Sequence, residues 1–213
     1  MKVLLVNGSP HEKGCTYTAL KEIAEVLNHE EIETEIFQVG KQPLTGCIAC
    51  WNCSKTGKCV FDDCVNEFLQ LAENFDGFIF GSPVHFASAS GSISPFMDRA
   101  FFVVNCSERK TFYLKPGAAI VSTRRAGATA ALDQLNKYFT KMEMPVISSR
   151  YWNMVHGNTP VEVKEDLEGL QIMRILGRNM AWFLKCKEAG EKAGIAFPEK
   201  EERISTNFIR HEE

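Results

Sequence analysis

Five short apolar runs rich in strand-forming residues alternate along the chain with segments of helical periodicity. The runs are KVLLVN at 2–7, ETEIFQV at 33–39, GFIFGSP at 77–83, GAAIVST at 117–123 and MPVISSR at 144–150. Apolar side chains recur at spacings of three and four in the segments between them, at 16–28, 62–74, 93–105 and 129–141. Strand and helix in regular alternation predict an α/β fold with a parallel sheet covered on both faces.

Parallel crossovers are right-handed, so the expected architecture is a three-layer, doubly wound, five-stranded parallel sheet that binds ligands beyond the carboxyl ends of its strands. A long amphipathic helix is predicted over 161–187 and should close one face of this sheet. The residues that follow are charged and weakly periodic. We therefore expect one domain over 1–187 and a charged C-terminal tail over 188–213.

The overall composition is that of an ordinary soluble domain. Of the 213 residues, 45% are hydrophobic and 24% charged, and the formal net charge is −3. This balance argues against a nucleic-acid surface or a polybasic membrane patch, and favours a small molecule or another protein as partner. The opening apolar run VLLV is too short for a secretory signal, and no later run approaches the length of a membrane span. A cytoplasmic location is expected.

The segment VNGSPHEKGCTYTAL at 6–20 joins the first strand to the first helix through small and hydroxylated residues. Such a junction leaves backbone N–H groups unpaired at a helix start and suits an anion. A Walker A loop is excluded, since Gly8 and Gly14 enclose five residues and Cys15 stands at the lysine position. A dinucleotide loop lacks its glycine spacing, and a phosphorylated receiver lacks its carboxylates. Neutral donors fit the terminal phosphate of FMN, with simple helix capping as the alternative.

Two further segments follow the third and fourth strands: GSPVHFASASGSISPFMDR at 81–99 and STRRAGATAALDQL at 122–135. Together with the first loop, they resemble the three flavin-contacting loops of the flavodoxin-like NAD(P)H-dependent FMN reductase family, over roughly residues 1–187. The resemblance implies the flavodoxin-like strand order 2-1-3-4-5. It also implies self-association as a homodimer or homotetramer.

Site residues follow from the same resemblance. The residues implied around the FMN phosphate are Ser9, His11, Cys15, Thr16 and Thr18. Those implied along the isoalloxazine ring are Pro83, Val84, His85 and Phe86 on one side and Thr123, Arg124, Arg125 and Gly127 on the other. A cation near the ring would favour the anionic reduced flavin. A solvated loop end is the alternative for the two arginines, and core packing is the alternative for Val84 and Phe86.

Five of the eight cysteines lie within eighteen residues, at 47–64. Four of them, Cys47, Cys50, Cys53 and Cys59, form the pattern C-x2-C-x2-C-x5-C, which lets one loop wrap a cubane cluster. A four-cysteine zinc site and free or redox-active thiols are the alternatives. The pattern resembles that of the iron-sulfur flavoproteins, a branch of the same superfamily, and so implies a [4Fe-4S] cluster on these four residues.

The predicted function is an FMN-dependent oxidoreductase. In this interpretation the flavin takes a hydride from NADH or NADPH and passes electrons to a small acceptor such as a quinone, a nitro compound or free flavin. No catalytic side chain is required, because the chain only has to bind, orient and shield the flavin. The alternative from a different class is an iron-sulfur flavoprotein that carries electrons between protein partners.

Overall fold

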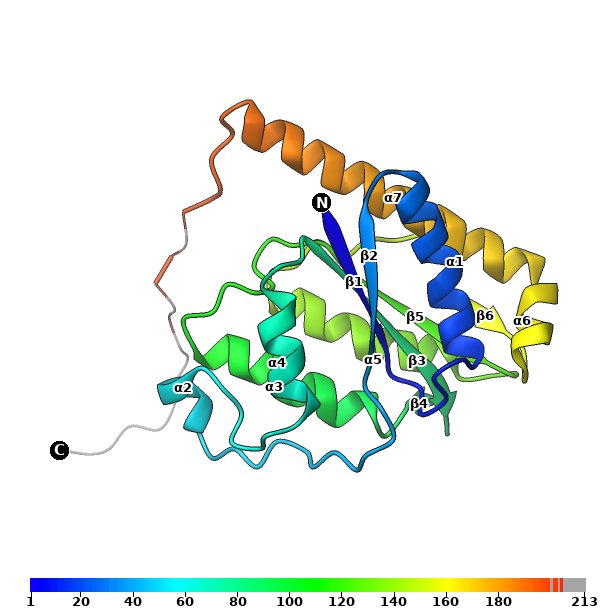
Figure 1. The fold of residues 1–213 in the computed structure, drawn as a ribbon, viewed down its shortest axis with the longest axis horizontal. Helices are drawn as coiled ribbons and strands as arrows, with labels where there is room; N and C mark the ends of the chain where they lie inside the picture. The colour runs from blue at the N-terminus through cyan, green and yellow to red at the C-terminus, as the bar shows by residue number, and fades with distance from the viewer. Residues whose placement is uncertain (200, 203, 205–213) are drawn as a thin grey trace.

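The structure of the chain is a computed structural model that describes residues 1–199, 201, 202 and 204. Five parallel strands form one sheet in the order β2-β1-β3-β5-β6 (Figure 1). Their bounds are β1 Lys2–Asn7, β2 Glu33–Gln38, β3 Gly77–His85, β5 Gly117–Thr123 and β6 Met154–His156. The two-residue β4 (Ser88–Ala89) turns back antiparallel to the end of β3. Without β4, this order is the predicted 2-1-3-4-5, so the predicted fold class is confirmed.

Helices cover both faces of the sheet (Figure 1). They are α1 Cys15–His29, α2 Asn52–Thr56, α3 Cys64–Ala72, α4 Ile93–Cys106, α5 Ala128–Lys141, α6 Pro160–Glu165 and α7 Leu167–Lys192. The buried residues of α1, α6 and α7 pack on one face, and those of α3, α4 and α5 pack on the other. Three layers follow, as the alternating pattern predicts.

Successive side chains of a strand point to opposite faces of the sheet, so each strand contributes to the hydrophobic core on both faces. In β1, Leu4 and Val6 face the α3–α5 layer, whereas Val3 and Leu5 face the α1–α7 layer. All four are fully buried. This double burial explains why the strand is a continuous apolar run.

The fifth parallel strand is not where the sequence pattern places it. The predicted strand at 144–150 makes only an isolated bridge, Val146 to Gly117, and the strand itself forms later as β6. The segment 144–150 bonds to β5 only at Gly117, the first residue of that strand. Gly117 N donates to Pro145 O, and Ile147 N donates to Gly117 O. The chain then leaves the sheet and returns at Met154, opposite Val121.

The helix predicted over 161–187 is two helices. The break lies at Asp166, whose backbone (φ −76°, ψ 76°) leaves the helical region and whose side chain accepts from Gly169 N to cap α7. Helix α7 continues to Lys192, five residues beyond the end of the predicted helix. Residues 200, 203 and 205–213 of the predicted tail lie outside the described residues. In the part of the chain that is described, no helix has the length and apolarity needed to cross a bilayer.

Candidate functional site

The loop that follows β1 is held against the end of β3. Gly8 N donates to Gly81 O at 2.8 Å, and Ser90 Oγ donates to Gly8 O at 2.9 Å. A Cβ on Gly8 would lie 2.7 Å from Ile93 and 2.8 Å from Gly81 O, so only glycine allows this approach. The first two loops of the site are therefore joined at their base.

Two side-chain amides, from the buried Asn7 and the half-buried Gln38, fix the shape of the same loop. Ser9 N donates to Asn7 Oδ1 at 3.1 Å, and Gln38 Nε2 donates to Ser9 O at 2.7 Å. The two amides also bond each other, from Asn7 Nδ2 to Gln38 Oε1 at 2.6 Å. Sequence reasoning missed both as site residues. Their signal was a polar residue at the carboxyl end of each of two neighbouring strands.

The N-terminus of α1 points its free amides into this loop. Its N-cap is Gly14, and no described side chain caps the helix. The Ser9 hydroxyl is buried beside it and accepts from His11 N at 3.1 Å, which leaves its own proton to donate. Neutral donors at a helix start, with the dipole behind them, suit a phosphate.

Three of the residues predicted at the phosphate have other partners through their side chains. Thr16 Oγ1 lies 2.8 Å from Ser122 Oγ, Thr18 Oγ1 donates to Gly14 O, and Cys15 Sγ donates to Gly157 O at 3.8 Å. Partial burial also raises the pKa of the Cys15 thiol. These side chains hold the loop in place, and their contacts with a phosphate stay a prediction. His11 is exposed.

The turns after β3 and β5 touch each other. Gly127 adopts φ +94°, and a Cβ there would lie 2.6 Å from Ala87 Cα and 3.2 Å from Val84 Cγ1. Val84 and Pro83 are half-buried, whereas His85 is exposed. Phe86 has a positive φ of 50° and is fully exposed, so it is not a core residue. An unsupported aromatic ring at this edge offers a flat apolar surface to a ligand.

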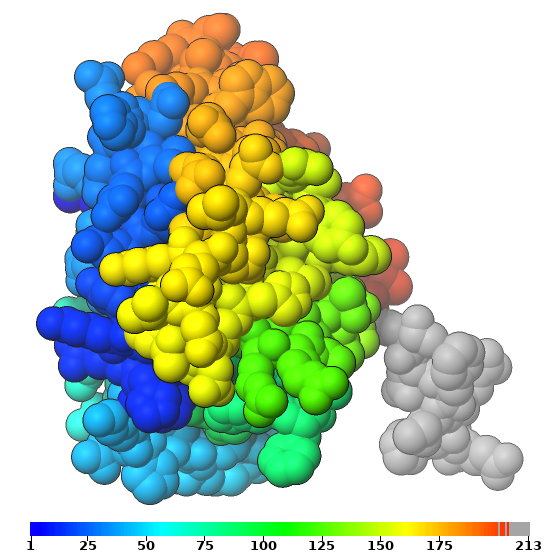
Figure 2. Space-filling model, turned by 90° about the vertical axis from the view of Figure 1, so that its right-hand side faces the viewer, coloured from blue at the N-terminus to red at the C-terminus, as the bar shows by residue number. Residues whose placement is uncertain are grey.

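The turn after β5 brings two arginines to the same edge. Thr123 is buried and donates to Ala126 O, while Arg124 and Arg125 are exposed and form no ion pair with any residue that the structure describes. Figure 2 faces this side of the molecule and shows the loop after β1 (dark blue), the turn after β5 (green) and the segment after β6 (yellow) side by side. The loop after β1 contacts the end of β3, and the turn after β3 contacts the turn after β5. The three predicted loops, after β1, β3 and β5, thus meet at the carboxyl edge of the sheet.

The four cysteines of the C-x2-C-x2-C-x5-C pattern line one small cavity between the loop around α2 and helix α4. Its other walls are mainly apolar: Ile48, Trp51, Val60, Phe61, Phe102 and Val103. The loop bends sharply, with left-handed φ at Ala49, Trp51 and Gly57. Cys59 is held by Asn66, which accepts from Cys59 N at 2.9 Å and donates to Cys59 O at 3.0 Å.

The thiols of this cavity differ in exposure. Cys47 and Cys50 are exposed, Cys59 is half-buried and Cys53 is buried. Burial, with smaller contributions from neighbouring thiols, raises the pKa of Cys53. No three Cys, His, Asp or Glu side chains among the described residues already form a metal-binding arrangement. The cavity therefore gathers the donors without pre-forming a coordination shell.

One charged side chain enters the same cavity. Arg99, from the buried face of α4, is 1% exposed and donates from Nε to Cys59 Sγ at 3.2 Å. Sequence reasoning placed Arg99 at the end of a flavin motif and gave it no role. Its signal was a lone cation within the apolar stripe of an amphipathic helix.

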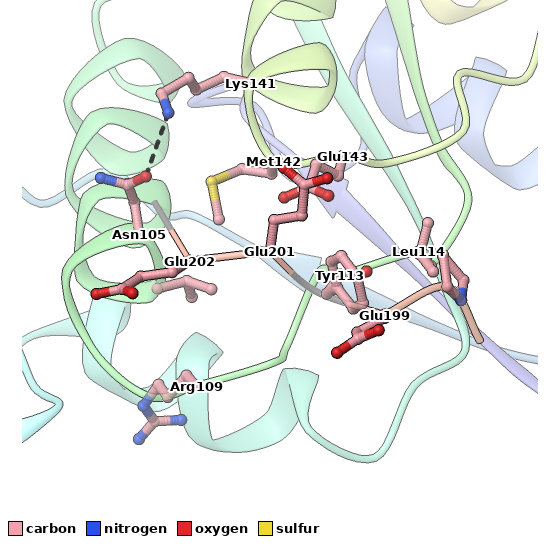
Figure 3. A pocket seen from close by; sticks show the side chains of 12 residues that line it. Asn105, Arg109, Tyr113, Leu114, Lys141, Met142, Glu143, Glu199, Glu201 and Glu202 are labelled. Carbon is pink, nitrogen blue, oxygen red and sulfur yellow. Dashed lines mark hydrogen bonds between the residues drawn. The ribbon is translucent and has the colours of Figure 1, made fainter. Parts of the chain in front are cut away.

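A larger cavity of about 630 Å³ lies away from these loops, where the tail passes the C-terminal ends of α4 and α5 (Figure 3). The tail contributes the carboxylates of Glu199, Glu201 and Glu202, and Lys141 Nζ donates to Asn105 Oδ1. None of the three loops after β1, β3 and β5 lines it. It is separate from the edge described above.

Comparison with known proteins agrees with this geometry. The model of the NADPH-dependent FMN reductase family matches residues 1–159. The chain belongs to this family. It is thus a flavin-dependent oxidoreductase by family, and FMN is the implied cofactor. The family expected from the three loop segments is confirmed.

Individual relatives are similar over nearly their whole length. An iron-sulfur flavoprotein of Methanocaldococcus jannaschii is 32% identical over 194 residues, covering 87% of this chain and 98% of that protein. Among solved structures, an archaeal flavodoxin covers 87% of this chain and 99% of its own at 16% identity, with a TM-score of 0.59. FerB, an NAD(P)H:acceptor oxidoreductase of Paracoccus denitrificans, covers 87% and 97% at 14% identity, with a TM-score of 0.63. These two structures support the fold.

Proposed function

We propose that this member of the FMN reductase family is an iron-sulfur flavoprotein that carries electrons between protein partners. It would bind FMN at the three loops and a [4Fe-4S] cluster at Cys47, Cys50, Cys53 and Cys59. The observation that carries the proposal is the single cavity lined by all four thiols. The name of the M. jannaschii relative points the same way.

The donor set fits an iron-sulfur cluster better than zinc. Three thiols at consecutive two-residue spacings come from one bend of the chain, whereas zinc sites more often use two separate pairs. The walls are mainly apolar, and Arg99 places a positive charge beside the sulfur of Cys59. A thiolate-bound cluster is anionic, so one buried cation suits it.

At the flavin edge, the chain's own task is to bind and orient. The free amides of α1 and the Ser9 hydroxyl would hold the phosphate, and the exposed ring of Phe86 would lie against the isoalloxazine system. Arg124 and Arg125 would place positive charge near that system and favour its reduced, anionic form. Bound FMN would supply one-electron chemistry, which electron transfer between the flavin, a cluster and protein partners requires.

The first experiment is a determination of iron and acid-labile sulfide in anaerobically purified full-length chain. We expect about four of each per chain together with one FMN. Changing all four loop cysteines to alanine should remove iron and sulfide and leave the flavin. Cys186→Ala, an exposed cysteine of α7, is the matched control and should keep both. A wild-type protein without iron and sulfide would exclude the cluster.

The second experiment separates a carrier from a reductase of small acceptors. Flavin absorbance is followed after anaerobic mixing with NADH or NADPH, and then with a quinone or a nitro compound. In a parallel experiment, reduced ferredoxin, a one-electron protein donor, replaces the nicotinamide. A carrier between protein partners should be reduced rapidly by the ferredoxin and slowly by NADH or NADPH, and it should turn over slowly with the small acceptors. Fast multiple turnover with the small acceptors in the cysteine-free variant would favour the reductase and contradict the carrier.

A further inference from the structure

We propose that Arg99 is a positioning residue that raises the reduction potential of a cluster bound at the cysteine cavity. The inference rests on the proposed function, because it requires a cluster at Cys59. It concerns a residue outside the cysteine pattern, on a different element of the fold.

The guanidinium of Arg99 cannot turn away from the cysteine. Nε donates to Cys59 Sγ at 3.2 Å, while the two terminal nitrogens bind both oxygens of Asp63, at 2.7 and 2.9 Å. The same nitrogens reach the carbonyls of Thr45 and Phe61, each at 3.4 Å. These five contacts match the five N–H groups of the side chain. The Nε–H is therefore committed to a cysteine sulfur of the cavity.

Stability alone does not account for this arrangement. Arg99 is 1% exposed, and its partner Asp63 is 29% exposed. Burying an ion pair is often no better for stability than packing apolar residues of similar volume, because desolvation offsets the attraction. The position lies on an apolar helix face, where leucine or methionine would pack without that cost. The N–H to sulfur contact gives the arginine a role that an apolar residue lacks.

The sign of the effect follows from charge. Reducing a cluster adds one electron, here from dithionite, and the added negative charge is stabilised by a nearby cation and by hydrogen bonds to the sulfurs. Arg99 therefore raises the potential. Asp63 forms the ion pair with this guanidinium and carries a negative charge, so it partly cancels the effect of Arg99 and lowers the potential. Two residues of one ion pair should shift the same potential in opposite directions.

The experiment is an anaerobic redox titration of the full-length protein, in which electron paramagnetic resonance follows the reduced cluster. Arg99→Gln should lower the midpoint by about 59 mV, the equivalent of tenfold in a one-electron equilibrium. Asp63→Asn should raise it, and the double variant should lie near wild type. Asn also caps helices, so Asp63→Asn keeps the bond from Val65 N that begins α3. Arg99→Lys keeps the charge and should fall between Arg99→Gln and wild type.

Arg174→Gln is the matched control. It removes one arginine from an ion pair with Glu22 on the opposite face of the sheet, and it should leave the midpoint unchanged. If Arg99→Gln does not fold, the upward shift in Asp63→Asn still tests the sign. Shifts of the same sign in both single variants, or none in either, would overturn the inference. Wild-type protein without iron would instead overturn the proposed function.

Discussion

Replacing Gly127 by alanine is the sharpest test of whether the loops after β3 and β5 form one binding edge. Gly127 adopts φ +94°, which favours glycine, and it sits directly against the backbone of Ala87. An alanine there would place its Cβ 2.6 Å from Ala87 Cα, closer than two carbon atoms can pack. Because the contact is with backbone, no side-chain rotation relieves it. The two loops have to separate.

The magnitude follows from two separate costs. A left-handed conformation costs alanine roughly 1–2 kcal/mol more than glycine. Overpacking a tight contact costs about 1–3 kcal/mol. The free energy of unfolding should therefore fall by roughly 2–5 kcal/mol, toward the lower end because an exposed loop can move. If FMN binding has to bring the two loops back together at a cost of about 1.4 kcal/mol, the Kd for FMN rises about tenfold.

Two measurements check this prediction: urea unfolding of the flavin-free protein, and titration of FMN followed by quenching of flavin fluorescence. Gly91→Ala is the matched control, since it lies near the same edge, has no positive φ and has nothing within 4 Å of its added Cβ. It should leave both quantities within about 0.5 kcal/mol of wild type. Equal FMN affinity in the two variants would refute a binding edge built from these loops.

Three further predictions concern single groups. Ser122→Ala removes the only described partner of the buried Thr16 hydroxyl. In urea unfolding, this change should lower the free energy of unfolding by about 1–3 kcal/mol. Adding Thr16→Val should recover much of the loss, because no unpaired hydroxyl then stays buried. Asp166→Ala removes the cap on Gly169 N and should cost about 0.5–2 kcal/mol, whereas Asp166→Asn should cost less. Burial, followed by the nearby Asp63 charge, raises the pKa of Cys64 to about 11. Its alkylation by iodoacetamide at pH 8, followed by mass spectrometry, should thus be slower than that of an ordinary thiol by on the order of a hundredfold, and should accelerate up to pH 11.

The parts of the fold that the sequence predicts well are those in which burial dictates the pattern. β1, β3 and β5 are apolar on both faces, so their runs mark them directly. β6 is three residues long, too short for any periodicity, whereas the apolar run before it makes only a bridge through Val146. The break at Asp166 had a readable signal, an N-cap residue in front of an apolar run. Apolar residues recur with helical spacing on both sides of Asp166, so the pattern predicted one continuous helix.

The sequence predicts those parts of the candidate site that require a particular residue type at a particular position. It does not predict the parts that depend on contacts between residues far apart in the chain. Small residues at strand ends mark the loops predicted to bind the flavin, and close spacing marks the cysteines. Asn66 and Arg99 reach Cys59 from two helices, across seven and forty positions, and no local pattern connects them with it. The tertiary structure brings a cation to the one cysteine that lies apart from the other three. The pattern therefore identifies the proposed ligands, whereas their electrostatic environment depends on packing between α3, α4 and the cysteine loop.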